Sequence, residues 1–145
     1  MELVHEFDFW AALKPAVVFG ERWFLEVAEG EVTGTRLNGA LLSGGGDWVR
    51  LGTDGWGRLD VRAQIQTDDG VALYTHYEGL LELNEVVVNA SAAGQATDWG
   101  DQYFRTAPRF ETGDERYQWL TTSLFVAEGH LIDGGGVEYH VHRVT

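Results

Sequence analysis

The chain has no cysteine, and this absence excludes several kinds of chemistry at once. Disulfide bonds, thiolate catalysis and zinc sites built on cysteine are all impossible. Only 2 of the 145 residues are proline, whereas 19 are glycine, a balance that is typical of tight turns rather than of an extended linker. No apolar run is long enough to span a bilayer.

Basic residues are also scarce. Lysine and arginine total 10 against 23 aspartates and glutamates, which gives a formal net charge of −13. This charge repels phosphate groups, so we expect neither nucleic acid nor an anionic membrane as a partner. The first ten residues include Glu2, Glu6 and Asp8, which a secretory signal would not carry, and we therefore expect a cytoplasmic protein.

The residues that are present alternate between apolar and polar over many short segments. The length fits one folded domain spanning residues 1–145. The clearest pattern is a hairpin, in which residues 59–66 alternate strictly, Asp69-Gly70 supplies a tight turn, and residues 71–79 return as the partner strand.

Further strands are expected where the same pattern recurs, at residues 3–9, 23–28, 31–37, 117–126 and 137–144. Glu29-Gly30 is expected to form a turn, and residues 90–100 a long loop of the kind that covers binding sites. Roughly nine strands at this spacing predict an all-β fold, a single antiparallel closed barrel, which also removes exposed sheet edges.

Two stretches of sequence carry a distinctive series of motifs. The first contains Gly34-Thr35-Arg36, Gly44-Gly45-Gly46-Asp47-Trp48, Asp54-Gly55, Leu59-Asp60-Val61-Arg62 and Thr67-Asp68-Asp69-Gly70. The second contains Tyr103-Phe104-Arg105-Thr106, Pro108, Phe110-Glu111-Thr112-Gly113, Tyr117 and Trp119-Leu120. In this order the motifs resemble the bacterial and fungal family called domain of unknown function 3237, from about residue 31 to residue 144.

The resemblance implies a lipocalin-like barrel with a central pocket, commonly assembled as a homodimer. The family motif carries asparagine after Trp-Leu, where this chain has Thr121. Because threonine offers only a small hydroxyl in place of an amide, the departure predicts a different ligand if this position contacts it.

Three glycines precede Asp47 and Trp48, so a tight bend would present a carboxylate beside an indole. An apolar neighbour raises the pKa of a carboxyl group, which makes Asp47 a candidate general acid or base and Trp48 a candidate for substrate binding. The alternative is that Asp47 caps a turn and Trp48 fills the core. The family resemblance adds weight to the functional interpretation.

Asp60 and Arg62 are two residues apart, so both side chains point to the same face of their strand. Asp60 is a second candidate for proton transfer, and Arg62 could donate hydrogen bonds to an anionic ligand. The alternative is a solvated outer face, because the opposite face of this strand is more apolar. The sequence leaves this choice open.

Arg105 and Glu111 flank Pro108 in a segment that is expected to form a loop at the barrel mouth. Arg105 could orient an anionic substrate, and Glu111 could transfer a proton. The alternative is a surface ion pair of little energetic value.

Aromatic and hydroxyl side chains supply candidate pocket walls. Tyr117, Trp119 and Thr121 share one face of an expected strand, while Tyr77 and Tyr139 belong to other strands. Such a mixture is normal for a small-molecule pocket, and it is equally normal for a barrel core. We assign all five residues to substrate binding.

His140 and His142 share a strand face, and His76 with Glu78 could lie on a neighbouring strand. Two histidines and a third ligand would suit zinc or iron. The alternation places His140 and His142 opposite apolar neighbours, toward solvent, so we expect no metal and no other cofactor.

Three functions remain open. The first is a cofactor-independent acid–base enzyme, of isomerase, cyclase or lyase type, acting on a small aromatic or carbonyl-bearing metabolite. The second is a non-catalytic binding protein for a hydrophobic ligand. The third is a dimeric structural or interaction protein with a filled barrel. The partner we expect is a small molecule, with a homodimer as the assembly.

Overall fold

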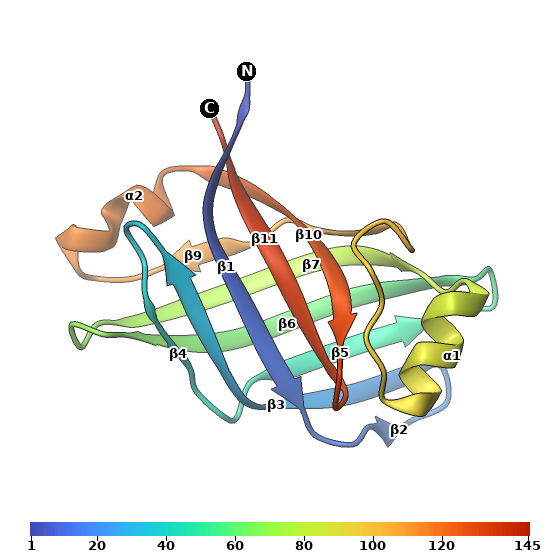
Figure 1. Cartoon of the computed structure of the whole chain (residues 1–145). Helices are drawn as coiled ribbons and strands as arrows, with labels where there is room; N and C mark the ends of the chain where they lie inside the picture. The colour runs from blue at the N-terminus through green and yellow to red at the C-terminus, as the bar shows by residue number, and fades with distance from the viewer.

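The computed structural model describes residues 1–145 and shows a closed wall of antiparallel strands with a short helix near each end (Figure 1). The strands are β1 (Leu3–Leu13), β2 (Val17–Val18), β3 (Arg22–Gly34), β4 (Gly39–Leu41), β5 (Gly46–Leu51), β6 (Trp56–Thr67), β7 (Ala72–Glu82), β8 (Phe104–Thr106), β9 (Arg109–Glu111), β10 (Leu124–Ile132) and β11 (Gly136–Val144). The helices are α1 (Glu85–Ala93) and α2 (Gln118–Thr121), and a 3₁₀ turn (Glu115–Tyr117) precedes α2. Neither helix is long and apolar enough to cross a membrane.

Eight of the strands form a closed ring. Their order around the barrel is β6, β5, β3, β1, β11, β10, β8 and β7, and β7 pairs with β6 to close it. Three short strands lie outside this ring, where β2 pairs with β3, β4 pairs with β3 and β6, and β9 pairs with β7. The expected closed antiparallel barrel is therefore confirmed, with eight strands in the ring rather than nine.

The hairpin of β6 and β7 follows the alternation of the sequence. Leu59, Val61, Ala63 and Ile65 are all buried, because successive side chains of a strand point to opposite faces. The turn between the strands uses Gly70 at a φ of +88°, a conformation that glycine adopts without steric cost. The apolar face of this hairpin becomes one wall of the barrel interior.

The two ends of the barrel differ in their contents. We call them the α1 end and the α2 end, after the helix that lies at each (Figure 1). At the α2 end the interior is filled by an aromatic cluster, in which Phe7 and Phe110 have ring centroids 5.8 Å apart and Phe110 and Phe125 have centroids 5.3 Å apart. Both pairs meet edge to face, a favoured geometry for aromatic side chains.

Charged groups close the α2 end outside this cluster. The Arg36 guanidinium lies 3.7 Å from the ring centroid of Trp119, and its Nη2 donates to the Glu6 carboxylate at 2.7 Å. Arg143 also donates to Glu6, from Nε at 2.8 Å. The glutamate side chain is only 8% exposed, so two arginines neutralise a nearly buried carboxylate.

The expected turn at Glu29-Gly30 is wrong, because β3 runs without interruption from Arg22 to Gly34. Gly30 instead permits a close approach between strands, since a Cβ atom there would lie 2.2 Å from the Trp10 carbonyl oxygen of β1. A glycine inside a strand often marks such a contact. Position 30 does require glycine, but the reason is the nearby backbone of β1 and not a turn.

The expected strand at residues 117–126 is wrong in its first half. The Asp114 side chain accepts a hydrogen bond from the Arg116 backbone N–H at 2.9 Å and so caps the 3₁₀ turn. The helical backbone continues through Thr121, and β10 begins only at Leu124. Tyr117, Trp119 and Thr121 therefore do not share the face of a strand.

The expected loop at residues 90–100 is also partly wrong, because α1 extends to Ala93. The Asn84 side chain accepts from the Val87 backbone N–H at 3.0 Å and begins the helix. Gly94 ends the helix in the left-handed conformation, at a φ of 64°. Only residues 94–100 have the irregular structure that was expected.

Candidate functional site

The α1 end of the barrel holds a cavity of about 480 Å³. This volume lies within the range of small-molecule sites in proteins. Of the 29 residues that line it, 23 are hydrophobic, so the wall favours a largely apolar occupant. The strand side chains on this wall include Trp23, Leu25, Val49, Leu51, Leu81 and Val137.

Helix α1 forms part of the same wall. Val87, Val88, Ala90 and Ser91 all border the cavity, together with Gly135 in the turn between β10 and β11. A hydrogen bond from the Gly134 N–H to the Gly94 carbonyl, at 2.9 Å, ties that turn to the end of the helix. The helix and this turn therefore cover the α1 end of the barrel (Figure 1).

Asp47 is the only acidic or basic residue that borders the cavity. It is the second residue of β5, and its cross-strand neighbours are Leu25 on β3 and Val61 on β6. Asp47, Val49 and Leu51 alternate inward along β5, so the strand period places the carboxyl group on an otherwise apolar face.

The Asp47 carboxylate replaces a backbone partner between β5 and β6. The pairing of these strands is interrupted between Asp47 and Arg50. Within the interruption, the Asp60 N–H donates to Asp47 Oδ1 at 3.0 Å, and Arg22 Nη1 donates to the Trp48 carbonyl at 2.7 Å. Side chains thus satisfy backbone groups that a regular ladder would pair with each other.

Burial raises the pKa of Asp47 from its usual 3.8 to about 7. The hydrogen bond from the Asp60 N–H acts in the opposite direction, the Asp60 carboxylate adds to the rise, and the Arg22 guanidinium lowers it. Desolvation in the apolar cavity is the dominant cause. Near neutral pH both the acid and the conjugate base of Asp47 are therefore populated.

Two tyrosines border the same cavity. Tyr77 and Tyr139 meet edge to face with ring centroids 5.6 Å apart, and each lies within the electrostatic influence of Asp47. Burial raises the pKa of both phenols above their usual value, so both are neutral at physiological pH. A neutral phenol can donate a hydrogen bond to a ligand oxygen.

The cavity thus brings together three of the eleven residues that the sequence analysis selected, namely Asp47, Tyr77 and Tyr139. This arrangement can accept a proton from a bound molecule, return it, and stabilise an oxygen that gains negative charge. The wall contains no histidine, and Asp47 is its only carboxylate, so it offers no conventional set of metal ligands.

Trp48, Asp60 and Arg62 lie outside the barrel. Trp48 is 44% exposed and packs on Phe24, with ring centroids 4.3 Å apart. The Asp60 side chain bonds to His76 Nε2 at 3.0 Å, while Arg62 donates to the Tyr74 hydroxyl on the outer face. The open question about Asp60 and Arg62 is therefore answered by the alternation of β6, which directs both side chains away from the cavity.

Arg105 and Glu111 also lie away from the cavity, on exposed faces of β8 and β9. Arg105 Nη2 lies 3.9 Å from the Glu128 carboxylate, and its Nη1 donates to the Phe104 carbonyl at 3.0 Å. Glu111 borders a shallow outer groove that also includes Arg62. The two residues do not form an ion pair with each other.

Tyr117, Trp119 and Thr121 belong to the α2 end. The Tyr117 hydroxyl donates to Asp69 Oδ1 at 2.7 Å, which ties the 3₁₀ turn to the β6–β7 turn. Trp119 lies beneath Arg36, and the Thr121 hydroxyl donates to the Gln118 carbonyl at 2.9 Å. These contacts hold the closed end of the barrel, on the opposite side from the cavity.

Sequence reasoning missed the contribution of α1 and of Trp23 to the cavity. The helix had a usable signal, because Asn84 and Gly94 are typical capping residues at its two ends. Its short length and its run of three valines obscured the helical periodicity. Trp23 had no comparable signal, because alternation alone does not say which half of a long strand borders a cavity.

Comparison with known proteins gives the family of the chain. The family described as "Protein of unknown function (DUF3237)" matches residues 1–144, and the chain belongs to this family. A UPF0311 protein of Clostridium acetobutylicum is 34% identical over 109 residues, which cover 75% of this chain and 69% of that protein. The expected family membership is confirmed.

Solved structures support the same fold. A conserved protein of unknown function from Rhodopseudomonas palustris has a TM-score of 0.90 and 30% identity, over 99% of this chain and 97% of that chain. A "beta-barrel like protein" from Acinetobacter baumannii has a TM-score of 0.84 and 25% identity, over 99% of this chain and 96% of that chain.

A more distant likeness is to a structure described as an enzyme from Penicillium herquei. The TM-score is 0.68 and the identity 20%, over 99% of this chain and 96% of that chain. At this identity the likeness shows a shared fold only.

Proposed function

We propose that the protein binds a small, largely apolar molecule in the cavity of the α1 end, and that Asp47 transfers a proton on that molecule. The observation that carries this proposal is the position of a single carboxyl group, with its pKa raised to about 7, on an apolar cavity wall. A general base works best when its pKa lies near the working pH. Ionisation of a carboxyl group in such a place destabilises the folded protein, and pKa values shifted in this way cluster at functional sites.

The proposed reaction needs no cofactor. Deprotonated Asp47 takes a proton from a carbon next to a carbonyl or from a phenolic hydroxyl, and becomes the neutral acid. Tyr77 or Tyr139 donates a hydrogen bond to the substrate oxygen as negative charge develops on it. Asp47 then returns the proton at a second position, which gives an isomerisation, a cyclisation or an addition–elimination with no net change in protons.

The cavity also limits the substrate class. No lysine, arginine or histidine borders it, so nothing there would balance the charge of a carboxylate or phosphate ligand. A neutral aromatic or carbonyl-bearing metabolite fits both the apolar wall and the two phenols. The likeness to an enzyme from Penicillium herquei is compatible with catalysis on this fold, without bearing on the substrate.

A second function is favoured by one specific observation. Arg62 and Arg105, which could have stabilised an anionic intermediate, both lie outside the cavity. A wall with one carboxyl group and two phenols also suits a protein that holds a hydrophobic ligand without changing it. A structural or interaction protein with a filled barrel would be consistent with the aromatic cluster at the α2 end, but it does not explain the cavity at the α1 end.

The test is hydrogen exchange into candidate substrates. Wild-type protein, Asp47→Asn and Glu111→Gln are each incubated in D₂O with a panel of neutral aromatic and cyclic ketones, followed by NMR. We expect the wild type and Glu111→Gln to catalyse deuterium uptake next to the carbonyl, and Asp47→Asn to lose it by about 100-fold or more. Glu111→Gln is the matched control, because it removes the same charge from the outer surface.

Binding is measured in parallel with the neutral fluorophore N-phenyl-1-naphthylamine. Binding by all three proteins without exchange by any of them would favour the non-catalytic function. Exchange that persists in Asp47→Asn would remove Asp47 from the mechanism. Absence of fluorophore binding by the wild type would contradict the cavity as a ligand site.

A further inference from the structure

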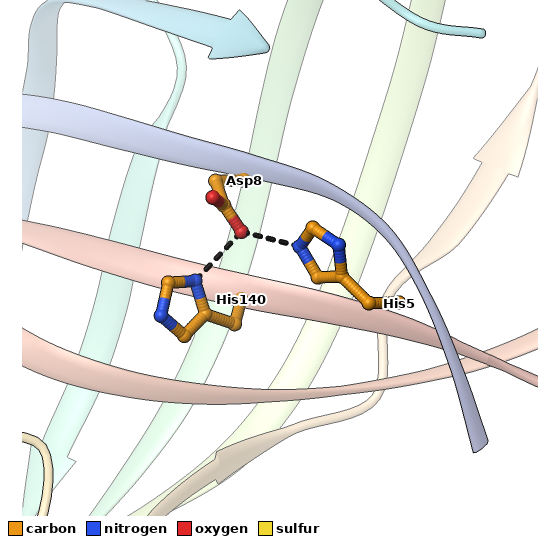
Figure 2. Close-up of side chains that lie close together, drawn as sticks. All are labelled: His5, Asp8 and His140. Atoms are coloured by element: carbon orange, nitrogen blue, oxygen red, sulfur yellow. Dashed lines mark hydrogen bonds and ion pairs between the residues drawn. The ribbon is translucent and has the colours of Figure 1, made fainter. Parts of the chain in front are cut away.

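A second cluster of titratable groups lies on the outer surface of the barrel, separate from the cavity. His5 and Asp8 come from β1 and His140 from β11, and Figure 2 shows the three side chains pointing toward one another. Asp8 Oδ1 accepts hydrogen bonds from His5 Nε2 at 2.7 Å and from His140 Nδ1 at 2.6 Å. One ligand atom from each residue lies within 4.8 Å of the other two.

A β-bulge creates this cluster. The β1–β11 register pairs His5 with His142 and then shifts, so that Phe7 pairs with Val141 and Asp8 with His140. In a regular strand residues 5 and 8 would point to opposite faces, whereas the additional residue at Glu6 lets both point outward. Without the bulge, His5 would be turned away from Asp8 and His140.

We propose that His5, Asp8 and His140 form a binding site for a divalent transition metal such as zinc. Two imidazoles and one carboxylate are a common zinc ligand set, and the fourth position is then free for water. The cluster is open to solvent, with side-chain exposures of 51% for His5, 38% for Asp8 and 33% for His140. A metal can therefore reach it, and water can complete the coordination.

The required movement is small. Ligand atoms around a tetrahedral zinc ion are about 3.4 Å apart, so the two hydrogen-bonded pairs must each widen by roughly 0.7 Å. The ring nitrogens that would bind the metal are the ones that now donate to Asp8, so each of them must first release its proton. A neutral imidazole does this by changing tautomer, with the proton then carried on its other nitrogen.

Neighbouring aromatic groups hold the cluster in place. Trp99 stacks on the His140 ring with centroids 3.8 Å apart and an interplanar angle of 17°. The His142 ring lies with its centroid 5.4 Å from that of His5 and is the nearest additional imidazole. An oriented ligand loses less conformational entropy when it binds the metal.

The metal would join the first and last strands of the barrel. Because β1 and β11 pair along their whole shared length, a metal held between them stabilises the folded state and not the unfolded chain. A bound metal should therefore raise the melting temperature of the protein.

The chain contains a built-in control for this proposal. Asp60, His76 and Glu78 form a similar outer cluster on β6 and β7, also with ligand atoms within 4.8 Å of one another. This second cluster offers only one imidazole, so it is the weaker candidate for zinc. His76→Ala removes a histidine of comparable exposure without touching the proposed site.

The experiment titrates ZnCl₂ into protein without a histidine tag by isothermal titration calorimetry, with thermal unfolding measured in the presence and absence of zinc. The proteins are the wild type, His5→Ala, Asp8→Asn, His140→Ala and His76→Ala. We expect the first three variants to bind zinc at least about tenfold more weakly than the wild type and to lose the zinc-dependent rise in melting temperature. His76→Ala should retain both.

His5→Ala and Asp8→Asn change exposed side chains, so they keep the test decisive if His140→Ala fails to fold. No zinc binding by the wild type at millimolar metal would overturn the proposal. So would binding that survives in both His5→Ala and Asp8→Asn, or binding that only His76→Ala removes.

Discussion

The two ends of the barrel are built from the same alternating strands, yet one is filled and the other is hollow. At the α2 end, rings from three separated strands meet in the cluster of Phe7, Phe110 and Phe125. At the α1 end, the inward positions carry mainly aliphatic groups, together with the rings of Trp23, Tyr77 and Tyr139 and one carboxyl group, Asp47, and space between them stays open. Strand alternation thus closes the barrel, whereas the way in which side chains fill the interior decides where space for a ligand remains.

The ends also differ in how they are covered. The α2 end is closed by charged groups that bond to one another, with Glu6 between Arg36 and Arg143. The α1 end is covered by a nine-residue helix that turns apolar side chains toward the cavity. The tightly packed core and the proposed ligand site thus lie toward opposite ends of the barrel.

The largest expected effect is the loss of an aromatic ring from the filled end. Phe7→Ala should reduce the free energy of unfolding by about 3–5 kcal/mol, because it leaves a cavity among packed rings. Leu51→Ala, on the wall of the existing cavity, should cost only about 1 kcal/mol, since one side of Leu51 already faces open space. Urea denaturation of both variants measures the contrast, and equal losses would contradict it.

Replacement of Asp47 should change stability in a pH-dependent way. The folded pKa is raised to about 7 from 3.8, so between about pH 4 and pH 7 the folded state holds a proton that the unfolded chain has released. Stability of the wild type therefore falls as the pH rises through this window, and the loss is complete above it.

Asp47→Asn removes this dependence. At pH 8 the variant should be more stable than the wild type by up to about 3 kcal/mol, and at pH 4 the two should be nearly equal. Denaturation curves at both pH values check the prediction, with Glu111→Gln as the control for loss of one charge. A variant that is less stable than the wild type at pH 8 would indicate that Asp47 is chiefly a partner for the Asp60 backbone.

Replacement of a buried alanine by leucine should reduce the free energy of unfolding by different amounts at the two ends of the barrel. Ala127 and Ala63 are both 2% exposed, but only Ala63 borders the cavity. Ala127→Leu should cost about 1–3 kcal/mol through overpacking, while Ala63→Leu should cost less than about 1 kcal/mol because its added atoms enter open space. Ala63→Leu should also weaken binding of N-phenyl-1-naphthylamine. A similar cost at both sites would mean that the cavity wall is already tightly packed.

The smallest effect concerns the cover of the cavity. Asn84→Ala removes the side chain that caps α1 and should cost about 1 kcal/mol. Amide hydrogen exchange should become faster in α1 than in the strands, because the loss is local. Unchanged protection of α1 would show that the helix is held by its packing on the barrel instead of by its cap.

The fold was predictable to the extent that strand alternation controls it. The β6–β7 hairpin follows directly from residues 59–66 and from Asp69-Gly70, and the closed barrel from the number of such segments. The wrong predictions of secondary structure arose where the same residue type is common in two kinds of structure. Gly30 permits close strand packing instead of a turn, and the aromatic residues near Tyr117 belong to helical turns instead of a strand.

The candidate site was predictable only in part, since it depends on which face and which end of a strand a residue occupies. Asp47 was selected for its place after three glycines, and the structure places it on the cavity wall. Asp60 and Arg62 could take part in proton transfer or anion binding, but they lie on the outer face of β6. The apolar residues that alternate with them already indicated this orientation. The cluster of His5, Asp8 and His140 could not be predicted from the sequence, because a bulge in β1 places His5 and Asp8 on the same face of the strand.

Measurement of the pKa of Asp47 itself tests whether this carboxyl group can transfer a proton near neutral pH. The carboxyl ¹³C resonance of Asp47 is followed from pH 3 to pH 9 by NMR and assigned by its absence in Asp47→Asn. We expect a titration midpoint near 7, which rises further when an apolar ligand fills the cavity and displaces water. A midpoint near 4 that does not respond to ligand would contradict the claim, because Asp47 would then be an ordinary solvated carboxylate.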